Sequence, residues 1–81
     1  MNELHVSKSL ISSAIAVVPS DLAVLTKASM GLFVGEQGDL KVLLVGDTVP
    51  VTFKNISGGM GLMVQRVYAT GTTATDILAL Y

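Results

Sequence analysis

The sequence contains no cysteine and one histidine, and charged residues make up only 14% of its 81 residues. Without cysteine, the chain has no disulfide, no thiolate ligand and no cysteine nucleophile. One histidine does not supply the nitrogen and sulfur ligands that the usual zinc sites require. Because charged residues normally account for about 25% of a soluble domain, the scarcity of charge is the main compositional signal.

The few charges that are present nearly cancel. Five basic and six acidic residues give a net charge of -1, whereas a protein that binds nucleic acid has a basic excess. Two tyrosines and two phenylalanines form no stacking platform for bases. The longest uncharged stretch, residues 9–20, is shorter than the ~20 apolar residues of a membrane-spanning helix. We therefore expect neither a nucleic-acid nor a membrane partner.

No group of residues has the pattern of a catalytic or ligand site. The single histidine, His5, lies near the N-terminus, with Glu3 as its nearest acidic residue. Residues 58–61 are glycine-rich but lack the Gly-Lys-Ser/Thr of a phosphate-binding loop. Most of the acidic residues stand beside turn residues, where aspartate is favoured for local hydrogen bonds: Asp21, Asp39, Asp47 and Asp76. We expect no enzyme, no cofactor and no metal.

From residue 13 onward, short apolar runs are separated by Gly, Pro, Asp, Asn and Ser, a pattern typical of strands joined by turns. Residues 22–27 could form a single helical turn, capped by Ser20 or Asp21. The apolar runs are residues 14–18, 30–34, 40–45, 49–56, 62–69 and 77–81, joined by expected hairpin turns at 36–39 and 46–48 and by expected loops at 55–61 and 71–76. The prediction is an all-β fold, a small antiparallel sandwich or barrel of about six strands. An N-terminal arm, residues 1–12, precedes a single β domain, residues 13–81.

Alternation within the runs predicts the buried side chains. In residues 49–54, every second residue is apolar, and Pro50 cannot donate to a ladder, so this strand should lie at a sheet edge or leave that site unpaired. The predicted core consists of Leu32, Val34, Leu40, Val42, Leu44, Val49, Val51 and Phe53.

Several runs are apolar on both faces and therefore need cover on both faces. A small domain without disulfides or a metal also gains stability from association. We therefore predict a homo-oligomer, and the alternative is a second sheet or a closed barrel that covers these residues within one chain. The candidate interface residues are Phe33, Leu43, Val45, Met63 and Val67.

The order of several short segments resembles a known family. The segments are AVVPSD at 16–21, GLFVG at 31–35, GDLKV at 38–42, VTF at 51–53, RVYATGTTAT at 66–75 and ILALY at 77–81. The most specific of them is ATGTTAT followed by the apolar end. Together they resemble the small head-spike base proteins of gene transfer agents and tailed phages, and the resemblance spans roughly residues 14–81.

The resemblance implies a β-rich, non-enzymatic virion component that oligomerises on the capsid as a head-spike base or a decoration (cement) protein. The implied partners are further copies of the chain, the major capsid protein and other virion proteins, including a spike or fibre. The implied location is the virion, after synthesis in the host cytoplasm. The alternative is a small β binding module, either a tail or fibre adaptor or a binder of host-surface carbohydrate. The residues that such a binding site would use are Tyr68, Tyr81 and the hydroxyl-bearing residues within 72–75.

Overall fold

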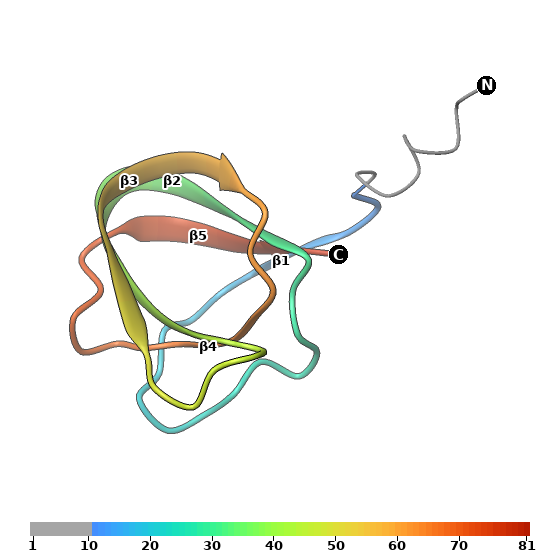
Figure 1. Cartoon of the computed structure of the whole chain (residues 1–81). Helices are drawn as coiled ribbons and strands as arrows, with labels where there is room; N and C mark the ends of the chain where they lie inside the picture. The colour runs from blue at the N-terminus through green and yellow to red at the C-terminus, as the bar shows by residue number, and fades with distance from the viewer. Residues whose placement is uncertain (1–10) are drawn as a thin grey trace.

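The computed structural model describes residues 11–81, and these residues form one antiparallel β-sheet (Figure 1). The strands are β1 (Ala14–Ala16), β2 (Gly31–Leu44), β3 (Val51–Met60), β4 (Val64–Val67) and β5 (Thr75–Leu80). Their order is β1-β5-β2-β3, with β4 paired to β2, so the sheet does not close into a barrel. The all-β prediction is confirmed, although the described residues form five strands rather than about six.

The long strand β2 connects the two halves of the molecule. Its first half pairs with β5 and its second half pairs with β4, while β3 pairs along the opposite side of both halves. The hairpin predicted at residues 36–39 was wrong, because this segment stays within β2. Gly38 lets a neighbouring segment approach closely, since a Cβ there would lie 2.5 Å from the backbone nitrogen of Ala74. Glycine and aspartate here mark an irregularity within one strand rather than a turn between two strands.

The loop predicted at residues 55–61 lies mostly within β3, which contains a bulge. The register passes from Leu40–Phe53 to Gly38–Ile56, so two β3 residues oppose one β2 residue, Asp39. Asn55, in the bulge, has a φ of 52° and donates its N–H to the Asp39 carboxylate at 2.9 Å. The side chain of Asp39 therefore holds the bulge in place.

The segment between β1 and β2 contains no helical turn at residues 22–27. Ser20 instead stabilises a bend, because its hydroxyl accepts the N–H groups of Leu22 and Ala23. The segment runs beside β4 and donates from Leu25 to the carbonyl of Gln65 at 2.8 Å. It thus covers the outer edge of β4. Over residues 11–81, no helix is long and apolar enough to cross a membrane.

The core lies on the side of β2 that carries its even-numbered residues. These side chains pack against β4 and β5, and the buried apolar residues are Leu32, Val34, Leu40, Val42, Val64, Val67, Ala74, Ile77 and Ala79. Leu44 and Phe53, both predicted core residues, are half-buried against this cluster. The backbone N–H of Ser12 donates a hydrogen bond to the carbonyl of Tyr81. Ser12, the last residue of the predicted arm (residues 1–12), therefore contacts the sheet. Residues 1–10 of that arm lie outside the described residues.

The core prediction for Val49 and Val51 needs correction. Val49 is 68% exposed and Val51 is 39% exposed. Val49 lies in the bend before β3 and not in the strand, so the alternation does not reach it. Val51 pairs with the buried Val42, but β3 is an edge strand and no further strand of the described chain covers its free side. The edge position inferred from Pro50 is confirmed.

Candidate interaction surface

The predicted interface residues do not form a single patch. Val45 donates its N–H to the carbonyl of Met63 at 2.9 Å, so these two exposed residues lie together at the C-terminal end of β2. Phe33, which is 43% exposed, lies on the other half of β2, and Leu43 is half-buried between these regions. The involvement of these four residues in an interface stays a prediction.

Val67 is the exception, because the structure places it in the core, where it is 2% exposed. The sequence prediction assumed uninterrupted alternation along residues 62–69. The register between β2 and β4 shifts between Leu43 and Leu44, so both Val64 and Val67 point inward although they are three residues apart. A local irregularity of the ladder therefore reverses the predicted side.

Phe33 belongs to a largely apolar surface on the side of the sheet opposite the core, with Asp76 at its border. In the ladder, Phe33 pairs with Leu78, which pairs with Ala16 of β1. The next row joins Gly31 to Leu80 and Leu80 to Ala14. We call this surface the outer apolar face, and its side chains are Ala14, Ala16, Phe33, Leu78 and Leu80.

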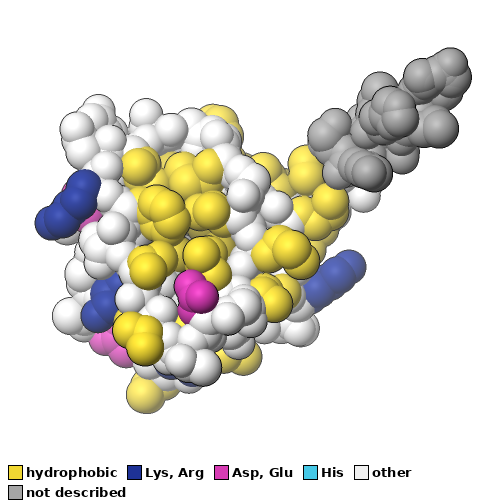
Figure 2. All heavy atoms as spheres, in the orientation of Figure 1, with side chains coloured by type: hydrophobic (Ala, Val, Ile, Leu, Met, Phe, Trp, Pro, Cys, Tyr) yellow, Lys and Arg dark blue, Asp and Glu magenta, His cyan; other side chains and the backbone are white. Residues whose placement is uncertain are grey.

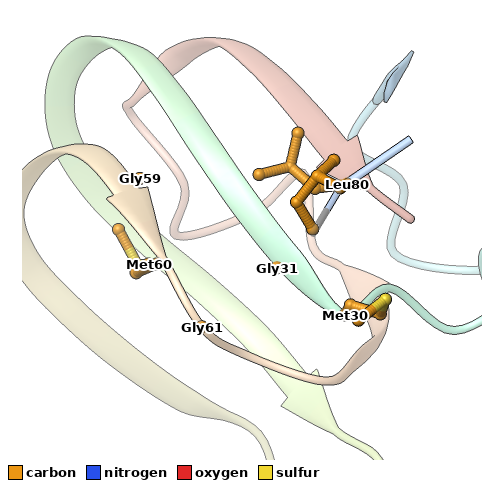
Figure 3. Close-up of a pocket in the computed structure, with 7 residues that line it drawn as sticks. Met30, Gly31, Gly59, Met60, Gly61 and Leu80 are labelled. Atoms are coloured by element: carbon orange, nitrogen blue, oxygen red, sulfur yellow. The ribbon is translucent and has the colours of Figure 1, made fainter. Parts of the chain in front are cut away.

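Two shallow hollows lie at this end of the sheet, and glycines line both of them. One, of about 440 Å³, is lined by Met30, Met60 and Leu80 around Gly31 (Figure 3). The other, of about 400 Å³, is lined mainly by apolar residues, including Phe33 and Leu78, together with Gly35 and the acidic Asp76. Apolar hollows of this size accept side chains of a protein partner, the usual anchor of a protein interface.

The second half of β2 presents a different outer surface. The Tyr68 ring lies 5.1 Å from the Lys41 ammonium and 5.4 Å from the Arg66 guanidinium. Asp21 accepts hydrogen bonds from the hydroxyl and N–H of Thr70 and from the N–H of Ala69. The Thr70 bonds are the main reason that the pKa of Asp21 lies below its ordinary value of 3.8. This surface is polar and joined by hydrogen bonds within the chain.

The hydroxyls proposed for carbohydrate binding are largely engaged by the chain itself. The Thr72 hydroxyl accepts the N–H of Lys41 at 3.0 Å, and the Thr73 hydroxyl accepts the N–H of Asp39 at 2.9 Å. The Thr75 hydroxyl donates to Glu36. The Tyr81 hydroxyl donates to the backbone carbonyl of Lys27 at 2.7 Å. These groups fasten the loop before β5 and the C-terminal end of the sheet to their neighbours.

Residues 11–81 show no group of three His, Asp or Glu side chains that could hold a metal ion. His5 lies outside the described residues. Sequence reasoning missed the contribution of Leu78, Leu80 and β1 to the outer apolar face. The signal was present in the terminal run ILALY, which is apolar on both faces, but its neighbours across the sheet were unknown.

An open, largely uncharged surface of this kind is typical of domains that act by contact with other proteins. In a wider search, no family model and no curated protein matches the chain. Among solved structures, the chain is similar to one from the capsid of a native GTA particle, computed with C5 symmetry. The two chains are 28% identical and superpose with a TM-score of 0.81, over 91% of this chain and 87% of that chain. The similarity thus spans nearly the whole sheet and not one motif.

Proposed function

We propose that the chain is a non-enzymatic structural protein of a virion, either a tailed phage or a gene transfer agent. In this proposal it oligomerises on the capsid as a head-spike base or a decoration (cement) protein. The observation that carries the proposal is the similarity in both sequence and fold to a chain of a GTA capsid. The segment order at 16–21, 31–35 and 66–75 points to the same class of protein.

The surface chemistry supports a role in assembly. Hydrophobic side chains gather in the middle of the face seen in Figure 2, where an acidic side chain lies beside them, and the basic side chains visible there lie toward the periphery. Phe33 lies on the side of β2 opposite the core and is about half exposed. Because fully burying a phenylalanine side chain contributes ~1.5–3 kcal/mol, a partner that covers Phe33 gains a part of this free energy on binding. A docking face with few charges limits the cost of desolvation, which falls mainly on Asp76 at its border.

The proposed partners are other copies of this chain and virion proteins, namely the major capsid protein and a spike or fibre. The proposed location is the assembled particle. The outer apolar face would contact the particle, because it is the described surface that combines exposed aliphatic and aromatic groups with hollows.

Adding the purified chain to particles that lack it tests the proposal. Particles are made in a producing strain from which the gene has been deleted, mixed with the purified chain and separated on a density gradient. We expect the chain to migrate with the particles and to saturate at a fixed number of copies per particle, measured by quantitative mass spectrometry. A chain that stays at the top of the gradient, and that is also absent from particles of the undeleted strain, would contradict the proposal.

A further inference from the structure

Two strand edges of the sheet have no hydrogen-bonded partner among residues 11–81. β1 pairs with β5 and β3 pairs with β2, and these two strands stand at opposite ends of the strand order. Two further backbone hydrogen bonds extend the pairing of β1 with β5, from the N–H of Ser13 to the carbonyl of Tyr81 and from the N–H of Val17 to the carbonyl of Ile77. Both lie on the side of β1 that faces β5. Residues 11–81 therefore present two free edges.

Free edges in natural proteins are usually protected by charge, proline or a bulge. The first half of β3 has all three, because Pro50 precedes it and Lys54 lies in its bulge. The second half, residues 56–60, contains no charge and no proline. Residues 12–18, which include β1, likewise contain neither. The second half of β3 also has a register shift, between Ile56 and Gly58, but neither it nor β1 is protected by charge or proline.

The side chains at the two free edges are complementary. On the core side of β3, Ile56 and Met60 are only half-buried, because no strand lies beside them. On the core side of β1, Ile15 is 58% exposed and pairs with the buried Ala79. If β1 were placed beside the second half of β3, Ile15 would lie on the same face as the half-buried β3 side chains and would cover them.

The opposite side of the sheet also matches. Ala14 and Ala16 of β1 and Gly59 of β3 lie on the outer face, where Gly59 is adjacent to Phe33. These residues are small, so two edges can approach without a clash between side chains. Edge pairing would join the outer apolar faces of two copies into one continuous surface.

We propose that the β1 edge of one copy pairs with the second half of β3, residues 56–60, of another copy. The two edges differ, so the contact is head-to-tail and generates a closed ring or an open filament. This inference deepens the oligomerisation in the proposed function by naming its surface, and it rests on that function. The occupant is a second copy because the same chain supplies both unprotected edges and side chains that match on both faces.

Charge substitutions on the outer face of the two edges test the pairing. The exposed residues Ala14 and Ser57 are changed in the full chain. Ala14→Lys and Ser57→Lys are made singly and are combined in one chain, the double-lysine chain. A fourth variant, the opposite-charge pair, combines Ala14→Glu with Ser57→Lys. Leu22→Lys is the matched control, since Leu22 is 89% exposed and lies outside both edges. Self-association is measured by sedimentation velocity from about 1 to 100 μM, and circular dichroism checks that each chain is folded.

We expect the unchanged chain to self-associate and Leu22→Lys to behave like it. The double-lysine chain should associate at least about tenfold more weakly, because like charges face each other across the paired edges. The Glu and Lys pair should restore association to within about threefold of the unchanged chain. A monomeric unchanged chain, a double-lysine chain that associates normally, or an opposite-charge pair as weak as double lysine would overturn the inference.

Particle binding separates this inference from the proposed function. The same variants are added to particles that lack the chain. If the unchanged chain binds particles but the charge series does not alter self-association, edge pairing is wrong and the virion role stands. If the charge series behaves as expected but no chain binds particles, edge pairing stands and the virion role is wrong.

Discussion

The two halves of β2 carry the same inward pattern but present opposite outer surfaces. Leu32 and Val34 in the first half, like Leu40 and Val42 in the second half, are buried. Outward, the first half presents Phe33 among mainly apolar residues, with Asp76 at their border, and the second half presents Lys41 beside the Tyr68 ring. The common inward pattern builds one core across both halves. The different outward patterns give the first half a mainly apolar outer surface and the second half a polar one that ends at the exposed Val45 and Met63.

The comparison also explains where the sheet is held and where it is open. The polar half is fastened by Asp21 and Asp39, whose carboxylates accept backbone N–H groups from distant segments. The apolar half ends in the free edges of β1 and β3. The carboxylates of Asp21 and Asp39 thus fasten the polar half, whereas β1, at one end of the strand order, borders the apolar half alone.

The largest expected effect comes from the glycine where the two halves meet. Gly38→Ala would place a methyl group against the backbone of residues 73 and 74, which cannot move as a flexible side chain can. We expect a loss of about 3 kcal/mol in the free energy of unfolding, at the upper end of overpacking effects. Urea denaturation measures it. The matched control, Gly46→Ala, has no atom within 4 Å of the new Cβ and should change stability by less than ~0.5 kcal/mol.

The second prediction compares the two outer surfaces directly. Phe33→Glu and Lys41→Glu each place a carboxylate on the outer side of β2, one in each half. We expect Phe33→Glu to weaken binding to particles at least about tenfold, because a charge in an apolar contact must be desolvated. Lys41→Glu should stay within about threefold of the unchanged chain. Equal losses in the two variants would contradict the assignment of the outer apolar face as the docking surface.

The third prediction concerns the pH dependence of the polar half. The hydroxyl and N–H of Thr70 lower the pKa of Asp21 below 3.8, and the N–H of Asn55 does the same for Asp39. Since both pKa values are lower in the folded chain, the unfolded chain binds protons first as the pH falls. Their stabilisation is complete above about pH 3.8 and is lost as the pH falls through the folded pKa values.

Asp21→Asn should therefore reduce the slope of unfolding free energy against pH in the acid range, while Phe33→Ser should leave that slope unchanged. Urea denaturation between about pH 2.5 and pH 6 measures both. A slope that Asp21→Asn leaves intact would show that its carboxylate does not fasten the segment between β1 and β2 to the loop after β4.

The smallest effect is expected at the exposed ion pair beside the bulge. Lys54 lies 3.4 Å from the Asp39 carboxylate, and its side chain is largely exposed. Exposed pairs of this kind are screened by water and salt. Lys54→Ala should therefore leave the denaturation midpoint unchanged, and the N–H of Asn55 should suffice to hold Asp39. A clear loss of stability would show that the ion pair, rather than this hydrogen bond, maintains the bulge.

Sequence reasoning predicted the parts of the fold that depend on local composition. The short β-type runs, the alternation around Leu32 and Val34 and the edge position next to Pro50 all follow from neighbours in the chain. The candidate surface was predicted less completely. Phe33 was named, but its neighbours Leu78 and Leu80 were not, because they become neighbours only when β5 pairs with β2.

The amino-acid sequence by itself determined an all-β chain with little charge and an inward-facing apolar pattern, since these properties reside in residue types and their spacing. Only the tertiary structure decided that residues 31–44 form one strand, that Val67 is buried and that Val49 is exposed. The reason is physical: a glycine or aspartate is compatible with a turn, a bulge or a bend, and the choice is made by the segment that packs against it. Gly38 shows this directly, because the backbone at Ala74, distant in sequence, occupies the space that any side chain would need.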